Sequence, residues 1–294
     1  MHKKEMRNWM FIISIFLLVA CDEVAYLRND EKPVLVLTAV LEAGCDSMRI
    51  ELTETKGAYD QSPWQRFPEA EVRVYEEGEL LGMAEYQPAD SSFVLRQPVK
   101  AERTYRIEAR VAGKGMVWGE TQVPRSPERY DFEIDFQEDN GWDYAVADCR
   151  WQDRAEDTDY YWLGAEAIGV FSMSWKAVKD LETDSALPDP VNRVFSLTNN
   201  SAYAWGIRIP DVGMNGQILS ISYRFLRETN RVRVCFWSLD KHYDAYLKSF
   251  HAHYYNAEPT EGEMPWAFYR VNVYSNVQGG TGLVGSYAVE RKMR

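Results

Sequence analysis

Apolar and polar residues alternate along most of the chain after residue 33, and this period of two is typical of half-buried β-strands. Short runs of this kind, separated by turns, fill residues 34 to 123. They are 34–41, 48–53, 70–75, 80–86, 93–95, 104–111 and 116–123. Pro124 and Pro127 end the series. About seven short strands in about ninety residues predict an N-terminal immunoglobulin-like β-sandwich.

A second series of strands begins after Pro127, where residues 130 to 136 alternate strictly. Its further runs are 142–151, 160–171, 193–197, 204–209, 218–226 and 231–237. The first two predict a hairpin around the acidic stretch Asp153–Asp159, which we expect to be a solvated turn. A Ca²⁺ loop is disfavoured because the stretch lacks the ligand spacing of an EF-hand. This series predicts a second antiparallel β-sandwich or barrel-like domain.

One segment has a helical period instead. Asp240 suits an N-cap, and the aromatic and apolar residues after it share one helix face. They are Tyr243, Tyr246, Leu247, Phe250 and Tyr254. The sequence therefore predicts a mainly β fold with one short helix. The proline cluster at 124–127 divides it into an N-terminal domain at 33–124 and a C-terminal domain at 125–294.

The start of the chain has the pattern of an export signal. Three basic residues among the first seven precede an apolar stretch from Trp9 to Ala20. As a helix this stretch would span about 18 Å, too short for a bilayer core of about 30 Å. We therefore predict a signal peptide over residues 1–20.

The signal ends in Leu18-Val19-Ala20-Cys21, which resembles a bacterial lipobox. We expect cleavage before Cys21 and lipidation of its thiol, with several acyl chains giving stable anchoring. Residues 21–32 are polar and short, and they suit a tether between the lipid and the folded part. An ordinary secretory signal with a chance cysteine is the alternative.

Charge and cysteine content exclude some classes of protein. The chain has 33 Lys and Arg against 45 Asp and Glu, a net charge of −12, which argues against nucleic-acid binding because phosphates need a basic surface. No later stretch approaches 18 apolar residues, so we expect no membrane-spanning segment in the mature protein. The remaining cysteines, Cys45, Cys149 and Cys235, lack metal-ligand spacing. Buried thiols in strands are favoured, and one disulfide stays an alternative.

Three histidines fall within twelve residues, namely His242, His251 and His253. Imidazole suits Zn, Cu, Ni or Fe, so a metal-binding module is one hypothesis. However, a helix would place His242 about 13 Å from the other two. Polar surface histidines at the helix ends are therefore the favoured interpretation.

Other candidate residues are glycines and tryptophans. Four glycines between 276 and 285 precede a strand and not a helix, which favours tight turns or close backbone approach over a phosphate cradle. Most tryptophans lie inside alternating runs and are expected in the core. Trp64 and Trp266, in loops beside prolines, are the candidate ligand-binding residues. Since GxSxG, HExxH and Cys–His motifs are lacking, we predict no catalytic residue, no enzyme and no cofactor.

Several segments carry a family resemblance. The lipobox is followed by Pro33–Leu37, and then by Ala70–Tyr75 and Thr104–Ile107. Later, Tyr243–Phe250 is followed by Ser275–Tyr287, in which Val284 stands where the family usually has Phe. Taken together, these segments resemble the domain-of-unknown-function 4249 family, a set of outer-membrane lipoproteins of Bacteroidota.

The resemblance implies a lipid-anchored, two-part β protein at the outer membrane, on the surface or the periplasmic face, often encoded near TonB-dependent nutrient receptors. Asp22 and Glu23, directly after Cys21, resemble the acidic export signals of such lipoproteins. The leading hypothesis is a binding or accessory protein associated with a TonB-dependent receptor. The alternatives are a structural or assembly lipoprotein of the envelope without a small ligand, and the metal-binding module.

Overall fold

A computed structural model describes residues 32–57, 60–126, 128–156, 158–167, 195–196, 205–210, 215–226, 231–257 and 272–294. Val34–Thr55 and Pro63–Arg294 form one compact unit. The other unit comprises Met1–Pro33 and Lys56–Ser62, and its described part includes a short turn in which the Ser62 amide donates to Asp60 Oδ1 at 2.9 Å. Among the described residues, no helix has the length and apolarity that crossing a membrane would need.

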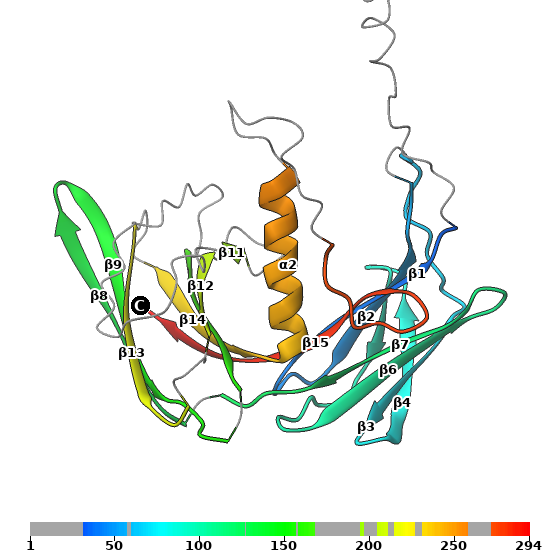
Figure 1. The fold of residues 1–294 in the computed structure, drawn as a ribbon, viewed down its shortest axis with the longest axis horizontal. Coiled ribbons are helices and arrows are strands. Elements are labelled where there is room, and N and C mark those ends of the chain that lie inside the picture. Colours follow the sequence, from blue (N-terminus) through cyan, green and yellow to red (C-terminus); the bar gives the residue numbers. More distant parts are fainter. Residues whose placement is uncertain are drawn as a thin grey trace, which may run out of the picture. The chain divides into compact units, whose positions relative to one another are not determined.

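Seven strands form the N-terminal part, as the alternation predicts. They are β1 (Leu35–Glu42), β2 (Met48–Glu54), β3 (Glu71–Glu76), β4 (Glu79–Gln87), β5 (Ser92–Leu95), β6 (Thr104–Val111) and β7 (Gly115–Gln122). Antiparallel pairing gives the order β1-β2-β5-β4-β3-β6-β7 (Figure 1). Every second residue of β1 and β6 is buried, and these side chains share one core with Phe67, Phe93 and Val117.

The second part contains the other strands and the helix. They are β8 (Glu128–Asp139), β9 (Trp142–Gln152), β10 (Tyr160–Ala167), β11 (Phe195–Ser196), β12 (Trp205–Pro210), β13 (Ile218–Leu226), β14 (Val232–Leu239), α2 (Lys241–Ala257) and β15 (Thr281–Met293). Strands β13, β9 and β8 form one sheet, while β11, β12, β10 and β14 belong to the larger one. Strand β14 is buried on both faces, because one packs against aromatic residues of the small sheet and the other against α2.

Strand β15 joins the two parts of the large sheet. Its first half pairs in parallel with β1, from Val36↔Thr281 to Glu42↔Tyr287. Its second half pairs antiparallel with β14, from Leu239↔Tyr287 to Arg233↔Met293. The result is a continuous sheet of twelve strands in the described part, with α2 in contact with β15 and standing across it (Figure 1).

The glycine-rich segment before β15 serves close backbone approach. Gly282 has φ 123°, and a Cβ added there would overlap the carbonyl oxygen of Leu37 on β1. Asn276 fixes the segment, since its side chain donates to the carbonyls of Glu120 (2.9 Å) and Val284 (2.8 Å) and accepts from the Val284 amide (3.0 Å). The interpretation of these glycines from the sequence is confirmed.

The predicted fold class is confirmed: the protein is mainly β with one helix among its described elements, and the large sheets do not close into a barrel. The predicted hairpin of 142–151 with 160–171 is wrong, because β9 pairs with β8 and β13 whereas β10 pairs with β12 and β14. The division into two domains at residue 124 stays a prediction. Two residues from beyond this boundary, Val277 and Val284, nevertheless pack in the hydrophobic core of the N-terminal strands. The predicted signal peptide lies outside the described residues, as does the tether except for Lys32.

Candidate functional site

The junction between β14 and α2 is organised by one buried carboxylate, that of Asp240. Its Oδ1 accepts the amide N–H of Tyr243 at 2.9 Å, and its Oδ2 accepts that of His242 at 3.2 Å. These bonds satisfy helix N–H groups that have no partner within the helix, so the predicted N-cap is confirmed. Burial raises the pKa of Asp240 above its usual 3.8, although the backbone N–H groups around it oppose the rise.

The same carboxylate connects the helix to the strands beneath it. Asp240 Oδ1 accepts the Ser286 amide at 3.0 Å, and the Asp240 amide donates to the Ser286 carbonyl at 3.0 Å. The Ser286 hydroxyl lies 2.7 Å from that of Thr121 on β7 and donates to the Gln122 carbonyl at 3.1 Å. All these side chains are buried. A continuous hydrogen-bonded chain therefore runs from β7 through β15 to the start of α2.

The acidic stretch between β9 and β10 is not the solvated turn that the sequence predicted. Asp153 and Asp159 are buried, and the Tyr161 hydroxyl lies 2.8 Å from a carboxylate oxygen of each. Arg154 pairs with both oxygens of Asp159, with an Nε–Oδ2 distance of 2.9 Å. Asp153 Oδ2 also accepts the Gly216 amide at 3.0 Å. These hydrogen bonds satisfy the two buried carboxylates, which connect the end of β9 in the small sheet to the start of β10 in the large one.

A second buried ion pair anchors α2 on the sheet. Arg208 of β12 makes two hydrogen bonds to Asp244 in the first turn of α2, at 2.6 and 2.7 Å. The indole N–H of Trp162, on β10, donates to Asp244 Oδ1 at 3.1 Å. A two-pronged pair with a third donor has the geometry that fixes orientation as well as contributing energy. The start of α2 is thus held at a defined place.

These supports surround a cleft of about 310 Å³, which we call the polar cleft. The start of β6, the end of β7, the β9–β10 connection and the β14–α2 junction line it. Its charged and titratable side chains are Glu102, Glu120, Arg154, Asp159, Tyr160, Asp240, Lys241 and His242. The volume lies at the small end of the range for ligand pockets, and the lining is more polar than is usual for them.

The electrostatics of the polar cleft follow from which charges are already paired. Arg154 and Asp159 neutralise each other, and Glu102 lies 3.5 Å from Arg125. Glu120 and Lys241 are exposed, and neither is in an ion pair within the described part of the chain. Burial lowers the pKa of His242 below its usual 6.5, against the opposing charge of Asp240, so the ring is neutral near pH 7. Its Nδ1 lies 2.7 Å from the Tyr274 hydroxyl. The cleft therefore offers one carboxylate, one ammonium group and a neutral imidazole.

A family model described as "Domain of unknown function (DUF4249)" matches residues 22–293. The chain belongs to this family. The match covers both parts of the fold and includes every residue that lines the polar cleft. No curated protein matches the chain.

Solved structures resemble this DUF4249 protein only distantly. A chain of a cytokine receptor complex is 9% identical with a TM-score of 0.26, and the match covers 69% of this chain and 84% of that one. Collagen adhesin from S. aureus is 10% identical with a TM-score of 0.25, with 87% and 94% covered. At these TM-scores the likenesses carry no argument about function.

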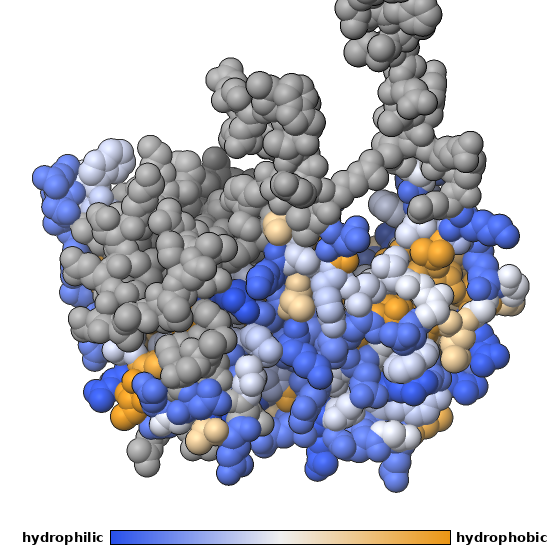
Figure 2. Space-filling model, viewed as in Figure 1, coloured by the Kyte–Doolittle hydropathy of each residue, from blue (hydrophilic) through white to orange (hydrophobic). Residues whose placement is uncertain are grey.

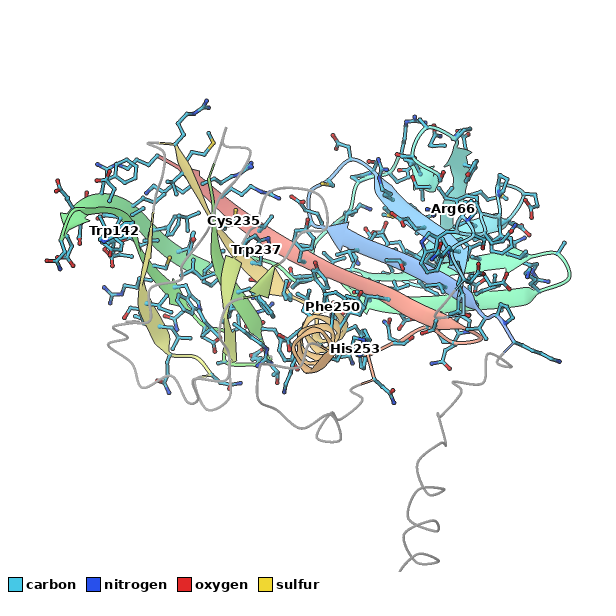
Figure 3. All side chains as sticks on the ribbon, turned by 90° about the horizontal axis from the view of Figure 1, so that it is seen from above. Arg66, Trp142, Cys235, Trp237, Phe250 and His253 are labelled. Carbon is cyan, nitrogen blue, oxygen red and sulfur yellow. The ribbon has the colours of Figure 1, made fainter. Side chains whose placement is uncertain are left out.

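The three histidines of the metal hypothesis are spread along α2. His242 lies at its start, beside Tyr274, while His253 is exposed near its other end (Figure 3). Eleven helical residues separate these two by about 16 Å, so they do not converge on one ion. The side chain of His251 lies outside the described part. Within that part, no three His, Cys, Asp or Glu side chains are grouped to hold a metal.

The other predicted residues have different outcomes. Trp64 is 55% exposed, as a binding residue requires, but the polar cleft does not include it. Cys21, Asp22, Glu23 and Trp266 lie outside the described residues. Within the described residues, Cys45, Cys149 and Cys235 form no disulfide; the last two are buried in strands as predicted, and Cys45 is partly exposed after a turn. Burial raises the pKa of the Cys149 thiol, which keeps it protonated.

The sequence did not reveal the polar cleft, because its residues come from four distant segments. Only Asp240 carried a signal, through its cap position. Trp142 was also misassigned, since we expected it in the core and it is 61% exposed. Trp142 lies on the face of β9 opposite to Ala145, Ala147 and Trp151, because side chains alternate along a strand. Val146 on that same face is buried, so the alternation alone did not predict that Trp142 is exposed.

Proposed function

We propose that the protein is a lipid-anchored binding protein of the outer membrane, which captures a small polar ligand and works beside a TonB-dependent nutrient receptor. The observation that carries the proposal is the polar cleft. Its walls are fixed by buried hydrogen bonds, and its lining includes two oppositely charged side chains, Glu120 and Lys241, that form no ion pair with any residue the structure describes. Lipid attachment at Cys21 would keep this site at the membrane.

The charges of the cleft point to the ligand's chemistry. Glu120 would accept hydrogen bonds from an ammonium group, and Lys241 would donate to a carboxylate. The neutral ring of His242 can accept or donate a hydrogen bond without adding charge. A zwitterion, such as an amino acid or a short peptide, is the ligand class that satisfies both charges at once.

Two experiments test this proposal. Detergent extraction of the tagged full-length protein should recover an outer-membrane barrel protein in stoichiometric amount, and a Cys21→Ser variant should not recover it. Cells lacking the protein should grow poorly on peptide-based nutrients alone. If deletion instead causes leakage of the envelope on every nutrient, the protein is an assembly lipoprotein and the proposal fails.

A further inference from the structure

The β8–β9 hairpin has a rigid construction and ends in an exposed indole. Its two-residue turn, Asn140–Gly141, has φ values of 52° and 79°, which is the type I′ geometry that matches the twist of the strands. Pairing continues up to Asp139↔Trp142, beside the turn. One face packs into the core through Phe132, Ile134 and Trp151. The hairpin therefore holds Trp142 at a fixed position (Figure 3).

The opposite face of this hairpin is strongly acidic. Asp131 and Glu133 are exposed on β8, as is Asp135, which forms an ion pair with Arg294 at 3.1 Å. Trp142 lies on the same face because it pairs with Asp139. Between Glu128 and Gln152 there are eight acidic residues against two basic ones. The end of the hairpin, at the upper left in Figures 1 and 2, is correspondingly hydrophilic.

Tryptophan is one of the residues that are enriched at the energetic centres of protein interfaces, and on a rigid element it supplies a large contact area with little entropy to lose. The core of this part is complete without Trp142, which contributes nothing to the buried cluster. We propose that the acidic face and end of the β8–β9 hairpin are a docking surface for a partner protein, which presents an apolar slot for the Trp142 indole within a basic surface. The charge of the hairpin selects a basic partner, because like charges facing each other would oppose association.

This docking surface does not depend on the polar cleft or on its ligand. The test places the photo-crosslinker p-benzoylphenylalanine at position 142 of the tagged full-length protein in the cells that produce it. The matched control position is 218, because Ile218 is also an exposed apolar residue of the same sheet, at 54% exposure. Ile218 pairs with Gln152, ten residues from Trp142 along β9 and hence about 33 Å away.

We expect one discrete adduct from position 142 and none from position 218, with the crosslink in a stretch of the partner rich in Lys and Arg. Replacing two exposed acids by Asp131→Asn and Glu133→Gln should lower the adduct yield about fivefold. The control pair Glu51→Gln and Glu69→Gln, which removes two exposed acids of the N-terminal part, should leave the yield unchanged. The proposal is overturned by equal labelling from both positions, by a crosslink to an acidic surface or to a second copy of this chain, or by a yield that does not respond to Asp131 and Glu133.

Discussion

Replacing Gly282 by Ala tests whether β15 is held against β1 by close backbone contact. The added Cβ would overlap the Leu37 carbonyl oxygen, and neither group can move without breaking the parallel pairing of β1 with β15. Overpacking of this kind costs about 1–3 kcal/mol. The φ of 123° lies in a region that only glycine adopts freely, which adds about 1–3 kcal/mol. The expected loss is therefore about 4 kcal/mol, a large part of the roughly 5–15 kcal/mol that stabilises a typical protein.

The matched control is Gly113→Ala. Gly113 also has a positive φ, of 75°, but a Cβ added there meets no atom within 4 Å, so the loss should be about 1 kcal/mol. Urea unfolding of the mature protein without residues 1–20, followed by tryptophan fluorescence, measures both. With an m-value of about 3 kcal/mol/M, the Gly282→Ala midpoint should lie roughly 1 M below that of Gly113→Ala. Equal midpoints for the two variants would refute the close-contact interpretation of β15.

Other predictions follow from the buried polar groups and the anchor. Asp240→Ala should destabilise the protein by about 3 kcal/mol in urea unfolding, because it removes the acceptor for three amides. Asp240→Asn keeps one acceptor oxygen, which can take the Tyr243 and Ser286 amides, and should cost only about 1 kcal/mol. Burial raises the pKa of folded Asp240, so the wild type should lose stability relative to Asp240→Asn as the pH rises from 3.8; a difference that is independent of pH would contradict this. Asp159→Asn should cost about 3 kcal/mol by leaving Arg154 without its charged partner, and a cost below 1 kcal/mol would show that the pair is solvated. Cys21→Ser should move the protein from the membrane fraction to the soluble one, and unchanged fractionation would exclude lipid anchoring.

Local patterns in the sequence predicted the elements well. The alternation of β1 and β6 placed their buried faces correctly, and Asp240 marked the start of α2, whose amides at His242 and Tyr243 it caps. A strand's buried face and a helix start are both set by the local backbone geometry. A sequence pattern over a few residues is therefore enough to predict them.

Such local patterns could not predict which strands pair when they lie far apart in the sequence. Nothing local distinguishes a β9–β10 hairpin from the observed crossing between sheets, which depends on Tyr161 bridging Asp153 and Asp159 inside the protein. In the same way, the parallel pairing of β15 with β1 joins residues more than 240 positions apart. The polar cleft is lined by four segments that such long-range pairing brings together, so only its helix-capping residue, Asp240, could be predicted.

The most direct test of the proposed function is growth of the deletion strain on peptides, restored by plasmid-borne variants. The cleft variant carries Glu120→Gln and Lys241→Gln, and the control carries Glu85→Gln and Arg96→Gln, an exposed pair 4.0 Å apart on the N-terminal part. Both variants keep the net charge of the chain unchanged. We predict that the wild type and the control restore growth, and that the cleft variant, present in the membrane at the same level, does not. Full growth with the cleft variant would contradict the proposal that this cleft binds the ligand.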